Sequence, residues 1–251
     1  GVVTNIITTD HSTGVVVTGT STDKSSLTGT SVSVDADAKE GISSLLIAAS
    51  GAQYAAVSAS VNVNRQLSDV SAAVDQTEVL GSFAQNANYL GRITTSAITA
   101  AGSQYAAVPI SVVINYADNA VSSSVAHSIL RAEGQSASVG ANRISEFSSL
   151  NVTASGAMYG AAAGLVNVNT IEGATSAEVN DSQVKAGQFS VNAENEDHLK
   201  VTDVTATGAI GSLGASVVVS YLKGSSVANL RNSTVTADNL TVSSLQNHFV
   251  K

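Results

Sequence analysis

The 251-residue sequence contains no cysteine and no tryptophan, and it has only one proline, one methionine and four phenylalanines. Without cysteine the chain has no disulfide framework and no thiolate metal site. Because bulky aromatic side chains are so few, small and β-branched residues have to fill any interior, which suits a narrow and regularly layered core. A single proline among recurring Val, Ile and Leu also argues against disorder.

Charge is scarce as well. Charged residues make up 12% of the sequence and the formal net charge is −8. The Lys and Arg residues are scattered and form no basic stripe, so we expect neither nucleic acid nor an anionic membrane as a partner. Ile93–Ala117 and Val204–Leu222 carry no charge and are long enough to span a bilayer. They are dense in Ser, Thr and Asn and alternate as strands do, so we expect no membrane insertion.

What the sequence does contain is a repeat. Ala48–Asn64, AASGAQYAAVSASVNVN, returns at Thr99–Asn115 and Thr153–Asn169, with a looser copy at Thr205–Ser220. Successive copies are 51, 54 and 52 residues apart, counted between the anchoring glycines Gly51, Gly102, Gly156 and Gly208. A period of this size is typical of stacked repeat proteins. We interpret residues 1–251 as one continuous solenoid segment.

The repeat boundaries follow from the glycines. Partial or divergent repeats cover residues 1–50 and 208–251, and full repeats cover about 51–101, 102–155 and 156–207. Two apolar columns align through four copies without a gap: Val74, Val125, Val179 and Leu230, and Val79, Leu130, Val184 and Val235. We expect each column to point inward on one sheet. We expect a charge to be costly at Val125 and tolerated at Ser123.

Short runs of period-two alternation, such as Ser58–Asn64 and Phe189–Ala193, predict strands and not helices. About five or six short strands fit into each repeat, separated by turn-prone pairs such as Asp118-Asn119. The sequence therefore predicts an all-β fold, a parallel β-helix (solenoid) with about two triangular coils per ~52-residue repeat. At ~4.8 Å per coil, the rod would be about 45–50 Å long.

Two local departures from the repeat give further expectations. Pro109 stands where Ser58 and Ala163 stand in other copies, and because proline cannot donate a ladder hydrogen bond we expect a bend there. Thr18–Ser26 carries about seven extra residues in the first repeat. In a solenoid such an insertion protrudes as a loop, where specificity could reside.

Two polar or aromatic columns have open interpretations. Asn64, Asn115 and Asn169 could form an amide ladder, but two coils per repeat would place them about 10 Å apart, so we favour a turn preference. The same separation leads us to favour a structural role over a carbohydrate-stacking face for the tyrosine column, which comprises Tyr54, Tyr105 and Tyr159.

No catalytic pattern emerges. The four histidines share no repeat position: His11, His127, His198 and His248. Acidic clusters at Asp35–Glu40 and Glu194–Asp197 could hold Ca²⁺, but they lack the spacing of calcium-binding coils, so we favour solvated turns. There is no nucleophile elbow and no phosphate-binding loop. We expect no enzymatic activity and assign no catalytic, cofactor-binding or metal-binding residue.

One resemblance is definite. A Gly-Ala-x-Tyr-x-Ala turn, a Val-x-Val-Asn strand and a closing Ser-x-Val-x-Ala-Gly turn, here Ser182–Gly187, resemble the repeats of bacterial filamentous adhesins and leukotoxin-like secreted exoproteins. The resemblance covers nearly the whole chain, most clearly after Ala48. The last copy, in which Gly211 replaces the tyrosine, fits less well. The resemblance implies a right-handed parallel β-helix at the bacterial cell surface, exported by two-partner secretion or as an autotransporter.

These observations predict a structural shaft of an extracellular filamentous adhesin, whose partners are adjacent repeats or end-to-end copies. The alternative is a direct binding module for host glycans or cells, acting through exposed loops. A polysaccharide-acting β-helix enzyme is a more remote alternative. Both termini cut through repeats, so we also expect an isolated segment to associate end to end, or to be stable only within a longer parent chain or filament.

Overall fold

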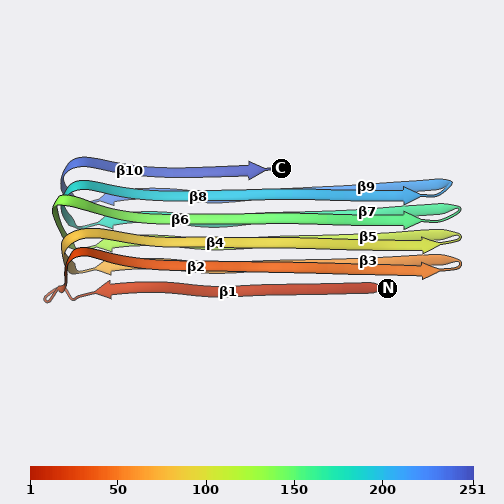
Figure 1. The fold of residues 1–251 in the computed structure, drawn as a ribbon, viewed down its shortest axis with the longest axis horizontal. Coiled ribbons are helices and arrows are strands. Elements are labelled where there is room, and N and C mark those ends of the chain that lie inside the picture. The colour runs from red at the N-terminus through yellow and green to blue at the C-terminus, as the bar shows by residue number, and fades with distance from the viewer.

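In the computed structural model, residues 1–251 form ten long strands in two parallel sheets (Figure 1). The strands are β1 (Val2–Thr18), β2 (Ser25–Ala52), β3 (Ala55–Asp75), β4 (Thr77–Ser103), β5 (Ala106–Ala126), β6 (Ile129–Gly156), β7 (Gly160–Asn180), β8 (Gln183–Gly208), β9 (Gly211–Arg231) and β10 (Thr234–Val250). Sheet A has the order β1-β3-β5-β7-β9 and sheet B the order β10-β8-β6-β4-β2. The chain therefore winds from one sheet to the other, and the expected all-β parallel solenoid is confirmed.

The expected two coils per repeat are wrong, because one repeat makes one coil. Ala55 pairs with Ala106 directly across the β3–β5 ladder, so neighbouring strands are one full repeat apart. The pair Asp118-Asn119, which we interpreted as a turn, lies inside β5. Five layers at ~4.8 Å give a stack only about 24 Å high, whereas strands of 21 residues extend about 70 Å at ~3.3 Å per residue. The molecule is wide and flat.

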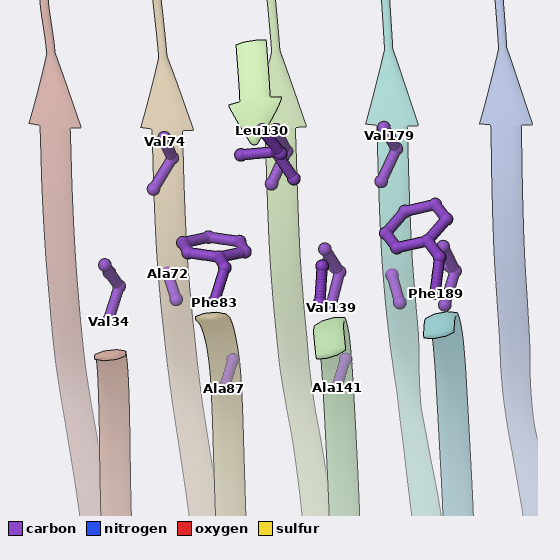
Figure 2. Close-up of a cluster of buried hydrophobic side chains, with 14 of the residues drawn as sticks. Val34, Ala72, Val74, Phe83, Ala87, Leu130, Val139, Ala141, Val179 and Phe189 are labelled. Atoms are coloured by element: carbon purple, nitrogen blue, oxygen red, sulfur yellow. The ribbon is translucent and has the colours of Figure 1, made fainter. Parts of the chain in front are cut away.

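The main apolar core occupies the half of each coil next to the one- or two-residue turns, such as those at His127 and Asp181. Figure 2 shows Val34, Phe83, Val139 and Phe189 among the side chains that meet between the sheets there. The two aligned apolar columns point into this core: Val74, Val125, Val179, Val79, Leu130 and Val184 are buried, and Leu230 and Val235 pack against them partly buried. The inward prediction for both columns is confirmed.

The expectation that Ser123 tolerates a charge is wrong. It is fully buried and faces the same interior as Val125, because residues two apart on a strand share a face. The residue that faces solvent beside them is Ser122, which is partly exposed.

The other half of each coil, next to the tyrosines, has the opposite pattern. Its interior contains rows of Ser, Thr, Asn and Gln beside a small apolar cluster of Leu46, Ala97 and Val113, while many Val and Ile side chains point outward. Asn64 donates to Asn115 at 2.9 Å and Asn115 donates to Asn169 at 2.8 Å, all within strands. The asparagines thus form the amide ladder that we had set aside in favour of a turn preference. The reason is the coil count, which brings them one ~4.8 Å step apart.

The bend expected at Pro109 is also wrong, because Pro109 lies buried inside β5. It pairs in register with Ser58 of β3. On the other side the β5–β7 pairing skips from Ala107 to Ile110. The missing N–H therefore interrupts one ladder locally without turning the strand.

Candidate functional site

The most exposed repeated feature is a column of tyrosines along one edge of the solenoid. Tyr54, Tyr105 and Tyr159 each occupy the position directly before β3, β5 and β7, and their side chains are 67%, 48% and 55% exposed. Ring centroids lie 5.6 Å apart between Tyr54 and Tyr105 and 5.4 Å apart between Tyr105 and Tyr159, with interplanar angles of 16° and 19°. The expected 10 Å separation is wrong, and the rings stack.

Backbone hydrogen bonds hold this column in place. Ala106 N–H donates to Tyr54 O at 3.1 Å, and Gly160 N–H donates to Tyr105 O at 3.0 Å. In the fourth coil Gly211 N–H makes the same bond to Tyr159 O, so Ile210 occupies the tyrosine position. The alignment that placed Gly211 there is therefore shifted by one residue, because this turn is shorter.

The stacking limits what the tyrosine column can bind. A sugar ring packs against the face of an aromatic ring, but here each face between neighbours is covered by the next tyrosine. Solvent meets the ring edges and the phenolic hydroxyls. The column offers hydrogen-bonding groups on an apolar ridge, and not a series of open stacking platforms.

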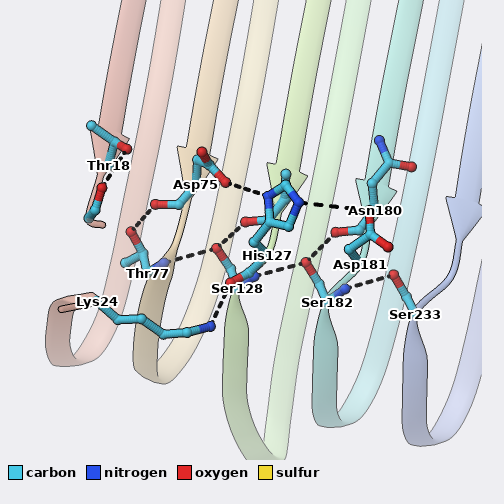
Figure 3. Close-up of polar contacts among 12 residues, drawn as sticks. Thr18, Lys24, Asp75, Thr77, His127, Ser128, Asn180, Asp181, Ser182 and Ser233 are labelled. Atoms are coloured by element: carbon cyan, nitrogen blue, oxygen red, sulfur yellow. Dashed lines mark hydrogen bonds and ion pairs between the residues drawn. The ribbon is translucent and has the colours of Figure 1, made fainter. Parts of the chain in front are cut away.

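The opposite edge is built from very short turns, shown in Figure 3. In four of the five turns one residue adopts the left-handed conformation, with φ near 50°: Gln76, His127, Asp181 and Asn232. The next residue closes the turn and also links coils, because Ser128 Oγ donates to Ala126 O at 2.6 Å and accepts from Thr77 N–H at 3.1 Å. Ser182 and Ser233 repeat the arrangement. These serines form a structural ladder.

His127 places an imidazole beside two carboxylates on this edge (Figure 3). Its Nδ1 is 2.9 Å from Asp75 Oδ1 and its Nε2 is 3.9 Å from Asp181 Oδ2. The combination of Ser, His and Asp resembles a catalytic triad in composition only. The Ser128 hydroxyl is already engaged with backbone groups, and both histidine nitrogens face carboxylates, so no side chain is poised as a nucleophile.

The insertion in the first repeat forms the loop Gly19–Lys24 between β1 and β2, as expected. Thr20 and Asp23 close it, with Thr20 N–H donating to Asp23 O at 2.8 Å. Lys24 Nζ donates to the carbonyl oxygen of His127 at 2.6 Å, which ties the loop to the third turn along the edge (Figure 3).

The interior contains one buried ion pair that sequence patterns did not reveal. Arg143 and Asp197 lie 2.9 Å apart with no exposed side-chain surface. The guanidinium also donates to Asn195 Oδ1 and to the carbonyl oxygen of Glu172. Asp197 is 3.0 Å from His248 Nδ1 on its other side. Arg143 and Asp197 are 54 residues apart in the sequence, about one repeat. This spacing predicts that they meet only once it is known which coils are paired.

Burial dominates the electrostatics of this pair. It raises the pKa of the Asp197 carboxyl, against the opposing attraction of Arg143 and His248, and it lowers the pKa of Arg143. Desolvation also raises the pKa of the nearby Tyr89 phenol. The cluster is enclosed, so its charges act on the structure of the stack.

The two acidic clusters lie inside strands, so our interpretation as solvated turns is wrong. Asp35 and Asp37 accept hydrogen bonds from Asn86 and Asn88 on the outer face of sheet B, at 2.8 and 2.7 Å. Glu40 instead accepts from Ser68 at 2.5 Å, on the inner side. Strand alternation sends neighbouring carboxylates to opposite faces. No group of three or more His, Asp or Glu side chains is arranged to hold a metal ion.

The chain contains no helix that is long and apolar enough to cross a membrane. Comparisons with protein-family models, with curated proteins and with solved structures found no match for this chain.

Proposed function

We propose that this chain is a shaft segment of a filamentous adhesin on the bacterial cell surface or in the secreted fraction. Its work is mechanical: it projects a binding tip or assembles into adhesive fibres. The proposal rests on the repeat style around Gly51 and its copies, which resembles that of such exoproteins, together with the geometry of the stack.

The observation that carries the proposal is the continuity of the register. Every strand pairs in parallel with the strand one repeat away, over nearly its whole length, from β1 to β9 and from β2 to β10. Each additional coil therefore adds backbone hydrogen bonds and continues the same rows of side chains. Such an architecture lengthens without changing its cross-section, which is what a shaft requires.

The direct test is immunogold electron microscopy of the native full-length protein on its cells, with antibodies raised against residues 1–251. A shaft predicts gold particles along the length of surface filaments or on released fibres. Label confined to the cytoplasm, or to a compact particle at the surface without any filament, would reject the proposal.

The alternative function, direct binding to glycans or cells, is favoured by the exposed tyrosine column. Glycan-array binding by the chain should then fall at least about 10-fold when Tyr105 is changed to Ala, since a central contact is worth about 1.4 kcal/mol or more. The matched control is Tyr116→Ala, which changes a tyrosine on the outer face of β5 away from this edge. Equal binding by both variants and the unmodified chain would remove the tyrosine column from consideration.

A further inference from the structure

The outer face of sheet A bears an apolar band over the half nearest the tyrosine edge. We define the apolar band as the outward-facing residues of sheet A between the tyrosine edge and the row that contains Ile114. Two of its rows run across the central strands, Val61, Val112 and Val166, and Val63, Ile114 and Val168. All six face away from the interior, toward solvent.

The valines of the band face outward although polar residues of the same strand face inward. Asn62 and Asn64 alternate with the valines of β3 and are fully buried. The interior behind the band is therefore largely polar, apart from a small cluster of Leu46, Ala97 and Val113, whereas its exterior is apolar. This is the reverse of the core half of the same strands. A sheet with a solvated outer face alternates polar residues outward, and contiguous apolar patches of this kind mark interaction surfaces. The pattern indicates that another surface covers the band.

The size of the band matches a protein interface. It extends over about nine residues of β3, β5, β7 and β9, or ~30 Å, and over the shorter segment 2–6 of β1, so that its five strands together span ~24 Å. One copy thus offers roughly 700 Å², and two such faces together would bury about 1,400 Å², which lies within the range of stable protein complexes. Facing sheets pack at about 10 Å, with β-branched side chains interdigitating.

The charges that surround the band indicate which kind of surface can cover it. The rest of the outer face of sheet A is acidic, with outward carboxylates at Asp10, Asp69, Asp75, Asp118, Glu172 and Glu178. Its outward cations are Arg65, Lys223 and Arg231. A membrane laid on this face would bring anionic headgroups against these carboxylates. The outer face of sheet B also carries exposed apolar side chains at the corresponding depth, including Leu45, Ile98 and Leu150, with Ser96 and Thr202 among them.

The same charges fix the orientation of a second copy. If the strands of two facing sheets ran parallel, the acidic halves would lie on each other and repel. If they run antiparallel, the bands overlap while each acidic half extends beyond its partner into solvent. We propose that two copies of this chain pair face to face through the apolar band of sheet A, with antiparallel strands and β5 opposite β5. This lateral pairing does not depend on what the shaft carries.

Charge substitution within and outside the band tests the pairing in solution. The test variant is the double substitution Val112→Glu and Val166→Glu, and the control is Ser122→Glu and Ser176→Glu, on the same strands and face but outside the band. Sedimentation equilibrium of the 251-residue chain should show a dimer. Its dissociation constant should rise at least about 100-fold in the test variant, because two charges per copy would be buried unpaired, and should change less than about 3-fold in the control.

Cross-linking tests the orientation. The chain has no cysteine, so a single Val112→Cys provides one thiol near the centre of the band, where a two-fold axis would bring it opposite its own copy. A short bis-maleimide should link two Val112→Cys chains efficiently. Ser122→Cys chains should not be linked, since antiparallel pairing would separate their thiols by about 66 Å.

Three results would overturn the proposal. The first is a wild-type chain that stays monomeric at all concentrations, and the second is a dimer that persists in the Val112→Glu, Val166→Glu variant. The third is a monomer that floats with phosphatidylcholine vesicles and loses this binding in the same variant, which would assign the band to lipid. Circular dichroism and unfolding midpoints verify that each variant is folded. None of these results would affect the immunogold test of the shaft.

Discussion

Arg143 is the largest side chain that the fold buries completely. A buried ion pair contributes little net stability, because the desolvation of both charges offsets their attraction. It does discriminate between registers, since a two-residue slide of β6 against β8 that moves Arg143 away from Asp197 would leave both charges buried without each other. In a stack of similar coils, where many registers bury similar valines, we interpret this pair as the device that fixes one of them.

Asp197 gives the stability of the protein a specific pH dependence. Burial raises the pKa of its carboxyl above the ordinary value of 3.8. Between 3.8 and the raised pKa, the folded chain holds a proton that the unfolded chain has released. The contribution of this group to stability is thus present at pH below 3.8 and is lost as the pH rises through the folded pKa.

We therefore expect Asp197→Asn to remove this slope. Urea unfolding of the wild type and the variant at a series of pH values from acid to neutral measures it. The wild-type free energy of unfolding should fall relative to that of the variant as the pH rises through the window. Asp69→Asn, at an exposed position, is the control and should leave the slope unchanged. A wild-type free energy of unfolding that rises with pH relative to that of Asp197→Asn would contradict the assigned direction.

Val125 tests the assignment of faces. It is fully buried in the main apolar core, so Val125→Asp should lower the free energy of unfolding by about 3–5 kcal/mol, as an uncompensated buried charge does. Ser122→Asp, on the outer face of the same strand, should cost less than about 0.5 kcal/mol. Chemical denaturation compares the two. Similar midpoints for both variants would show that β5 is turned the other way.

At the scale of elements, the turns decide where each strand ends. A single left-handed residue followed by Ser or Thr reverses the chain at Gln76, His127, Asp181 and Asn232. Non-glycine residues adopt this conformation at some cost, with Asn and Asp among the most tolerant. The first turn uses Gly19–Lys24 instead, but Ser25 still occupies the closing position, since its Oγ donates to Thr18 O at 2.7 Å.

The inserted loop should consequently be dispensable for folding. Replacing Gly19–Lys24 by a single Asn copies the turn at Asn232 and should change the free energy of unfolding by less than about 1 kcal/mol, because loop-closure entropy varies slowly with length. A single Val in the same place should cost about 1–2 kcal/mol more, since a β-branched residue resists positive φ. Thermal unfolding of both variants measures this. If the Asn variant fails to fold, the loop has a structural role that its contacts do not reveal.

At the scale of the whole molecule, one repeat forms one coil, and this predicts which deletions are tolerated. Removing Gly51–Ala101 takes out one full coil and joins β2 to β5 in the register that β3 had. Arg143 and Asp197 remain paired. The shortened chain should keep its β circular dichroism and unfold cooperatively, with a stack thinner by ~4.8 Å.

The control deletion is Gly51–Gln76, which removes 26 residues, the length of the smaller coil that we first expected. It would be tolerated if the repeat contained two coils. With one coil per repeat it removes β3 and joins β2 directly to β4, so the chain should not fold. Cooperative folding of this shorter deletion and failure of the full-coil deletion would contradict the observed winding.

The sequence by itself determined the period, the strand class and the inward columns. Alternation is a local property, and it reports which face a residue occupies wherever a strand passes, as Val74 and Val79 show. It cannot report how far a strand continues, because an outward Asp118 in a strand and an Asp118 in a turn are both solvated. Whether Asp118 lies in a strand or in a turn decides the number of coils per repeat, and our expectation of two coils was wrong.

Only the tertiary structure decided which copies touch. Tyr54 and Tyr105 stack, Asn64 bonds to Asn115, and Arg143 meets Asp197 because the chain closes one coil per repeat. The physical reason is that coil closure depends on where a single residue reverses the backbone. His127 is an example, because nothing in its side chain predicts the left-handed conformation that it adopts. Pairing across more than fifty residues then follows from that one local event.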